Sequence, residues 1–168
     1  MHKFFTFIIF LTLITFTISF PYSNFRRDSL SGYTQCSGSF PNEVTYFSFS
    51  PNPVVVGQTV TYYVTEVNTA TIQQGAILNV TGSYQQHVVF NEVTDFCKEW
   101  IEVNGYKCPL EPGTYSLVVS EYINPGPNDP KNATIEYDLR VEVANPGDPG
   151  DPETILTCME GKYPIYAP

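Results

Sequence analysis

The sequence has few of the side chains that most often carry out acid–base or nucleophilic chemistry. It contains two histidines, and only His87 lies beyond the apolar N-terminal segment. It has no nucleophile elbow and no phosphate-binding glycine loop. The glutamates near the central cysteines are more typical of a solvated face than of an acid–base pair. An enzyme is therefore the least favoured class, and we expect the protein to act through a surface or a cavity.

Basic residues are also scarce. The 168 residues include eight Lys and Arg against seventeen Asp and Glu, a formal net charge of -9. A chain without a basic patch is not suited to bind nucleic acid. It also lacks the polybasic segment that would hold it on an anionic membrane. We expect a soluble monomer that makes only transient contact with membranes.

A long apolar run occurs once, at the N-terminus. Residues 1–19 combine an early lysine, an unbroken apolar stretch and small residues near position 19, which predicts a signal peptide. The alternative, a membrane anchor, needs about 20 apolar residues. Residues 20–35 are polar, and we interpret them as an N-terminal tail or, because of Arg26-Arg27, as a pro-segment. We therefore expect the protein to be secreted or to reside in the lumen of the secretory or vacuolar pathway.

Four cysteines follow the apolar segment: Cys36, Cys97, Cys108 and Cys158. An even number in an oxidising compartment predicts two disulfides, and four cysteines permit three pairings. Cys97 and Cys108 are the local pair, whereas a bond between Cys36 and Cys158 would join the two ends of the folded region. A zinc site is the alternative, but the sequence contains no Cys-x-x-Cys spacing. We expect no metal and no other cofactor.

Segments in which apolar and polar residues alternate recur along the chain, and helix signals are weak. The clearest is 134–143, where apolar residues occupy every second position from Ile135 and charged residues fill most positions between them. Turn residues separate these segments, and no crossover helices for a parallel sheet are present. We predict an all-β fold, an antiparallel β-sandwich of about seven to eight strands in one domain, residues 36–168. The expected strands are 44–49, 59–67, 76–81, 87–93, 114–123, 134–143 and 153–158.

Two Asn-x-Ser/Thr sequons predict N-glycosylation, at Asn79 and Asn132. Asn132 lies in an expected loop. Asn79 lies in an expected strand, so a glycan there requires that its side chain face solvent and that Leu78 and Val80 face inward.

Several short motifs together resemble a known family. They begin with Cys36, a proline-glycine break over 51–57, and Gly75-Ala76 opening a strand. Asp95-Phe96-Cys97, Cys108-Pro109-Leu110 with Gly113, and Leu156-Thr157-Cys158 complete the set. The chain is similar over roughly 36–160 to the ML lipid-recognition domain, and within that family to the fungal-type phosphatidylglycerol/phosphatidylinositol transfer proteins. The loop at 145–152 and the tail after Cys158 depart from the family pattern.

The resemblance implies an immunoglobulin-like sandwich with an apolar cavity between its two sheets. It implies the disulfides Cys36–Cys158 and Cys97–Cys108. It also implies that the protein carries one lipid between membranes, either a phospholipid or, as in sterol carriers of the Niemann-Pick type C kind, a sterol. A secreted recognition module with a filled core is the alternative from a different class.

The expected lipid-binding residues are the apolar positions that face inward near the central cysteines. Without the resemblance, such positions are typical of an ordinary core. The set is Val60, Tyr62, Val64, Val88, Phe90, Leu110, Tyr115, Leu117, Tyr137, Leu139 and Val141.

Overall fold

The structure is a computed structural model that describes residues 29–126, 129–147 and 152–168. The expected signal peptide, the first part of the expected tail and part of the loop at 145–152 lie outside these ranges. In the described part, no helix is long and apolar enough to cross a membrane.

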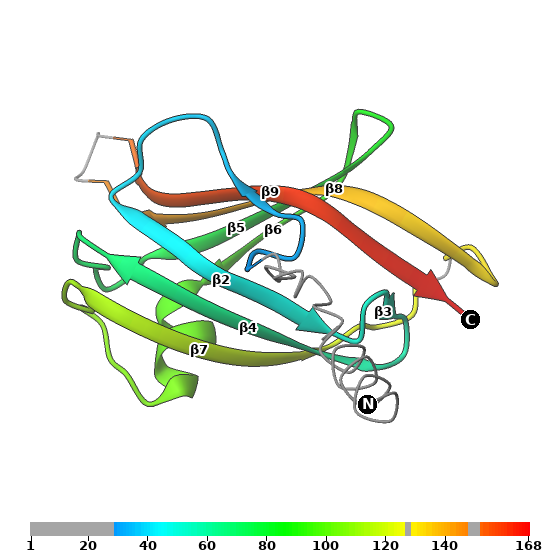
Figure 1. Cartoon of the computed structure of the whole chain (residues 1–168), viewed down its shortest axis with the longest axis horizontal. Helices are drawn as coiled ribbons and strands as arrows, with labels where there is room; N and C mark the ends of the chain where they lie inside the picture. Colours follow the sequence, from blue (N-terminus) through cyan, green and yellow to red (C-terminus); the bar gives the residue numbers. More distant parts are fainter. Residues whose placement is uncertain (1–28, 127–128, 148–151) are drawn as a thin grey trace, which may run out of the picture.

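Two β-sheets face each other, with a short helical segment at one edge (Figure 1). In the larger sheet the strand order is β1-β9-β8-β5-β6, and β3 adds to β9 in parallel; in the smaller sheet it is β2-β4-β7. All other pairs are antiparallel. The elements are β1 Thr34–Gln35, β2 Asn42–Ser50, β3 Val54–Val55, β4 Thr59–Asn68, β5 Ile77–Tyr84, β6 His87–Asp95, η1 Cys97–Ile101, η2 Glu102–Asn104, β7 Gly113–Tyr122, β8 Ala133–Asn145 and β9 Thr154–Ala167.

The predicted antiparallel sandwich is confirmed, and each of the seven expected strands matches an observed strand. The alternation that predicted them has a direct cause, because one face of each strand packs between the sheets. The main difference is β9, which was expected to end at Cys158 and instead runs to Ala167. The long partner strand β8 explains the extension, since its ladder continues to the pair Ala133–Ala167.

The folded region begins before Cys36. Tyr33 is 3% exposed, the backbone N–H of Phe47 donates to the Ser29 carbonyl, and β1 pairs with β9. Residues 29–35, expected as part of a tail, thus belong to the sandwich. The reason is the burial of the large Tyr33 ring, which gains free energy, together with Leu30, which packs against the same cluster.

Both disulfides of the implied pairing are present. Cys36–Cys158 joins the residue after β1 to β9, and Cys97–Cys108 closes the loop that contains the helical segment. A first buried cluster surrounds Cys97 and includes Ile101 and Leu117. A second cluster includes Val54 and Tyr163 at the other end of the sandwich.

A β-bulge in β6 reverses the side-chain alternation near the hairpin. Phe90 lies opposite Gly82, but the next pair is Val88 with Ser83, so Val89 is the extra residue. An inserted residue shifts the alternation, so the side chains beyond the bulge, toward the hairpin, face the opposite side from the one that the pattern predicts. Val88 consequently lies on the outer face and is 65% exposed. The expectation that Val88 faces inward is therefore wrong.

The Tyr33 ring packs directly against Gly161 in β9. A Cβ atom at position 161 would lie 2.5 Å from that ring. We expect Gly161→Ala to displace Tyr33 and lower the unfolding free energy by about 1–3 kcal/mol, the usual cost of overpacking. Urea unfolding of the purified protein measures this.

The control is a double-mutant cycle with Tyr33→Ala. Without the ring, Gly161→Ala should cost much less, because the two side chains are in direct contact. An equal cost in both backgrounds would contradict the packing argument.

Candidate functional site

Two adjoining hollows lie between the sheets, where the two core clusters meet. The larger hollow, of about 340 Å³, is bordered by η1 and by the edge strands β6 and β7. The smaller hollow, of about 70 Å³, is lined by residues of both sheets, including Leu117 and Val143. Tyr33, Phe47 and Trp100 line both, so the two hollows adjoin within one apolar region between the sheets.

Six of the expected lipid-binding residues line this region. Tyr62, Phe90 and Leu139 line the larger hollow, Val64 and Leu117 line the smaller one, and Val141 lines both. They come from β4, β6, β7 and β8, so the alternation correctly identified residues of distant strands that line the same region. That they bind lipid stays a prediction.

The other five do not line either hollow. Val60 and Leu110 are fully packed in the two core clusters. Tyr115 packs edge-on against Tyr106, outside both hollows. Tyr137 packs against Tyr84 and Phe90, and Val88 lies on the outer face. A period of two identifies a face of a strand, but it does not tell a packed position from one beside a cavity.

Sequence reasoning missed several lining residues, chiefly aromatic ones. Trp100 comes from η1, which gave no helical signal, and it stacks on Phe96. Tyr33 and Tyr163 lie in segments expected to be irregular. The single tryptophan beside the local cysteine pair was the available signal for Trp100.

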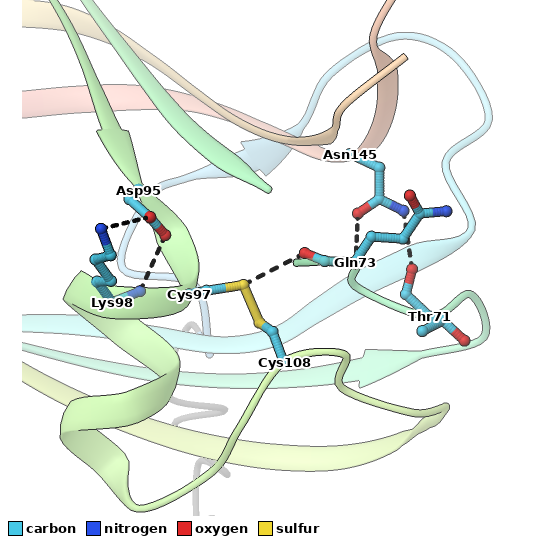
Figure 2. Close-up of a disulfide and its surroundings, with 7 residues drawn as sticks. All are labelled: Thr71, Gln73, Asp95, Cys97, Lys98, Cys108 and Asn145. Atoms are coloured by element: carbon cyan, nitrogen blue, oxygen red, sulfur yellow. Dashed lines mark hydrogen bonds and ion pairs between the residues drawn. A yellow bond between two sulfur atoms is a disulfide. The ribbon is translucent and has the colours of Figure 1, made fainter. Parts of the chain in front are cut away.

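The helical segment is held at the sheet edge by side-chain contacts (Figure 2). Asp95 Oδ1 accepts from the backbone N–H of Lys98, and Asp95 Oδ2 lies 3.5 Å from Lys98 Nζ. The Cys97–Cys108 disulfide fixes both ends of the segment, and Cys97 Sγ contacts the Gln73 carbonyl at 3.3 Å. These contacts position the Trp100 ring.

Two asparagines complete this support. Asn145 at the end of β8 accepts from the Gln73 N–H and donates to the Thr71 carbonyl (Figure 2). Asn104 at the end of η2 bonds both backbone groups of Val118 in β7 and also donates to the Trp100 carbonyl. Asn104 thereby satisfies backbone hydrogen-bonding groups of an edge strand, as a neighbouring strand would.

Two tyrosine hydroxyls bridge the sheets beside the larger hollow. The Tyr62 and Tyr163 oxygens are 2.5 Å apart, one from each sheet. Burial raises the pKa of Tyr62 well above its usual range, and it raises the pKa of Tyr163 to about 12. Both hydroxyls are therefore neutral at physiological pH. The Tyr33 hydroxyl is also buried and, among the described residues, has no hydrogen-bond partner.

One carboxyl group lies in the wall of the smaller hollow. Glu66 is 3% exposed, and its Oε1 accepts from Asn68 Nδ2 at 3.1 Å. Burial raises the pKa of Glu66, and the Asn68 hydrogen bond offsets only part of that effect.

Comparison with known proteins places this architecture in a family. The ML domain profile matches residues 31–164. The chain belongs to the ML domain family. Two curated relatives named phosphatidylglycerol/phosphatidylinositol transfer protein are similar to it. The protein of Kluyveromyces lactis is 30% identical over 45% of this chain and 44% of its own length. The protein of Neurospora crassa is 30% identical over 54% of this chain and 50% of its own length.

The chain thus spans about half the length of these relatives. A solved structure of a Niemann-Pick type C2 protein from the Japanese carpenter ant shares the fold of this ML domain. Its TM-score is 0.60 at 15% identity, over 79% of this chain and 98% of that one.

Replacement of the buried carboxyl tests the electrostatics of the wall. A raised folded-state pKa means that the native state binds the proton more tightly than the unfolded state, so stability is lost as pH rises through that pKa. Glu66→Gln keeps an acceptor for Asn68 and removes the charge. We expect it to raise the unfolding free energy at pH 7 and to have little effect near pH 3.5, below the ordinary Glu pKa of about 4.3.

Thermal unfolding at the two pH values measures this difference. The matched control is Glu43→Gln, which removes an exposed carboxyl from the neighbouring strand β2. An equal gain from Glu66→Gln at both pH values would show that its effect is not ionisation.

Proposed function

We propose that this ML domain binds one lipid between its sheets and carries it from one membrane to another without covalent chemistry. The observation that carries the proposal is the pair of adjoining apolar hollows, the larger of which is bordered by edge strands β6 and β7. Sandwich sheets normally fill the space between them with side chains. A hollow of about 340 Å³ falls within the roughly 300–1,000 Å³ typical of small-molecule sites.

The energetics explain why a carrier of this form is useful. Moving an acyl chain of about 16 carbons from an apolar environment to water costs on the order of 12 kcal/mol of free energy, at about 0.8 kcal/mol per CH₂. Walls formed by side chains such as Val64, Leu117 and Val141 replace the membrane interior during transfer. The tails then lie between the sheets, and the head group stays at the opening beside β6 and β7.

Two ligand classes are supported by different observations. The names of the curated relatives support phosphatidylglycerol and phosphatidylinositol. The buried Tyr33 hydroxyl without a partner among the described residues supports a ligand with a hydroxyl group, such as a sterol.

Other features fit a protein of the secretory pathway. The two disulfides are stable in an oxidising compartment, and the expected signal peptide would deliver the chain there. Asn132 is exposed at the start of β8, and Asn79 lies on the outer face, since its neighbours Leu78 and Val80 line the larger hollow. Glycosylation at both sites, a monomeric state and transient membrane contact belong to this proposal.

Native mass spectrometry of the secreted protein, followed by lipid extraction, tests the proposal directly. We expect one lipid per chain. A lipid-free mass, together with no transfer between vesicles, would support the recognition module with a filled core instead.

A substitution in the wall tests where the lipid lies. Val141 lines both hollows, so Val141→Phe should fill part of the space and reduce lipid transfer by at least about tenfold, a loss of roughly 1.4 kcal/mol of binding. Fluorescent-lipid transfer between vesicles measures the rate.

The matched control is Val93→Phe, because Val93 is 57% exposed on β6. Circular dichroism confirms that both variants are folded. Equal transfer by the two folded variants would place the ligand elsewhere.

A further inference from the structure

The charges around the two hollows are all of one sign. Three carboxylates line the larger hollow, Glu92 from β6, Glu99 from η1 and Glu121 from β7. Glu66 lines the smaller hollow. Among the described residues, no Lys, Arg or His lines either one.

Two of these carboxylates occupy positions where an apolar side chain is expected. Glu92 follows Phe90 at the two-residue spacing of the inward face, opposite Val80. Glu121 continues the inward face of Leu117 and Val119 and lies opposite the fully buried Val60. Each lies on an edge strand, so the two face the opening from opposite sheets, with Glu99 of η1 beside them.

Glu121 lies within electrostatic reach of the other two carboxylates. Burial raises the pKa of Glu121, and the nearby charges of Glu92 and Glu99 raise it further. The geometric basis for a joint action is that all three carboxylates line the same hollow.

Three basic side chains of the described structure are engaged in ion pairs, and Lys107 and Lys131 line neither hollow. Lys98, the basic residue of η1, is paired with Asp95. Arg140 pairs with Glu142, and Lys162 pairs with Asp138 and Glu136. These last two basic groups come from positions of β8 and β9 that face away from the hollows. Within the described ranges, a phosphate at the opening would therefore meet three carboxylates and no basic side chain in the lining.

We propose that Glu92, Glu99 and Glu121 select the head group of the bound lipid, excluding anionic head groups and admitting uncharged ones that carry a hydroxyl. This inference rests on the proposed lipid-carrier function and narrows its ligand class. Specificity arises from the repulsion between these carboxylates and an anionic head group, since apolar walls hold the tails of anionic and uncharged lipids equally well. Carboxylates accept hydrogen bonds from a hydroxyl, and the buried Tyr33 hydroxyl offers a further partner.

The test compares two lipids that have identical acyl chains. Fluorescently tailed diacylglycerol and phosphatidylglycerol are each placed as a minor component in neutral phosphatidylcholine vesicles. Transfer by the full-length protein is measured after subtraction of the spontaneous rate. We expect diacylglycerol to be transferred at least about tenfold faster, with the difference shrinking at high salt because screening weakens the repulsion.

The deciding variant is Glu92→Gln/Glu99→Gln/Glu121→Gln, which keeps the shape of the opening and removes its charge. We expect it to transfer phosphatidylglycerol at about the rate of diacylglycerol. The matched control, Glu43→Gln/Glu153→Gln/Glu160→Gln, changes net charge equally at exposed positions outside both hollows and should keep the wild-type preference.

Each other outcome has a distinct meaning. Efficient phosphatidylglycerol transfer by the wild-type protein overturns the charge filter and leaves the carrier function intact. An unchanged preference in the triple variant also overturns it. The inward-facing carboxylates on the edge strands would then be explained as protection against aggregation. Transfer of neither lipid by any form, together with a lipid-free native mass, overturns the carrier function itself.

Discussion

The Cys97–Cys108 disulfide and the helical segment that it closes are the constraint on which the rest of the site depends. The segment lies at the edge of the sandwich between β6 and β7, and it places Trp100 in the wall of both hollows. A short π-helical turn has little stability of its own. Its position comes from the disulfide, from Asp95 at its start and from Asn104, which bonds the edge of β7.

The same edge explains why a sandwich can remain hollow. Sheets that pack freely approach to about 10 Å and exclude empty space. Here the ends are filled by two packed clusters, and Tyr62 and Tyr163 connect the sheets across the larger hollow. The space between these fixed points cannot be filled by sliding one sheet over the other. An unfilled apolar region is costly in isolation. The lipid proposed above would offset that cost.

Membership of the ML family and a shared fold do not by themselves define the ligand. The similarity to the Niemann-Pick type C2 protein covers the architecture at 15% identity. Ligand choice depends on the few polar groups placed in an apolar wall. Among the described residues of this chain, the charged groups in the lining are carboxylates, and the proposal on head-group choice rests on them.

The sequence by itself determined the class of fold, the location of seven strands and the family, but not the short strands β1 and β3 or the full length of β9. Period-two alternation in segments such as 134–143 reports one buried face, and that is a local property. It also identified Tyr62, Val64, Phe90, Leu117, Leu139 and Val141, which the structure places around the hollows. Only the tertiary structure decided which inward positions border free space. Val60 has the period-two pattern and Leu110 belongs to the Cys108-Pro109-Leu110 motif, but both are packed. The bulge in β6 turned Val88 outward, and Tyr33 and Tyr163 were buried by partners far along the chain. Packing of this kind depends on contacts between distant segments, and no local pattern encodes them.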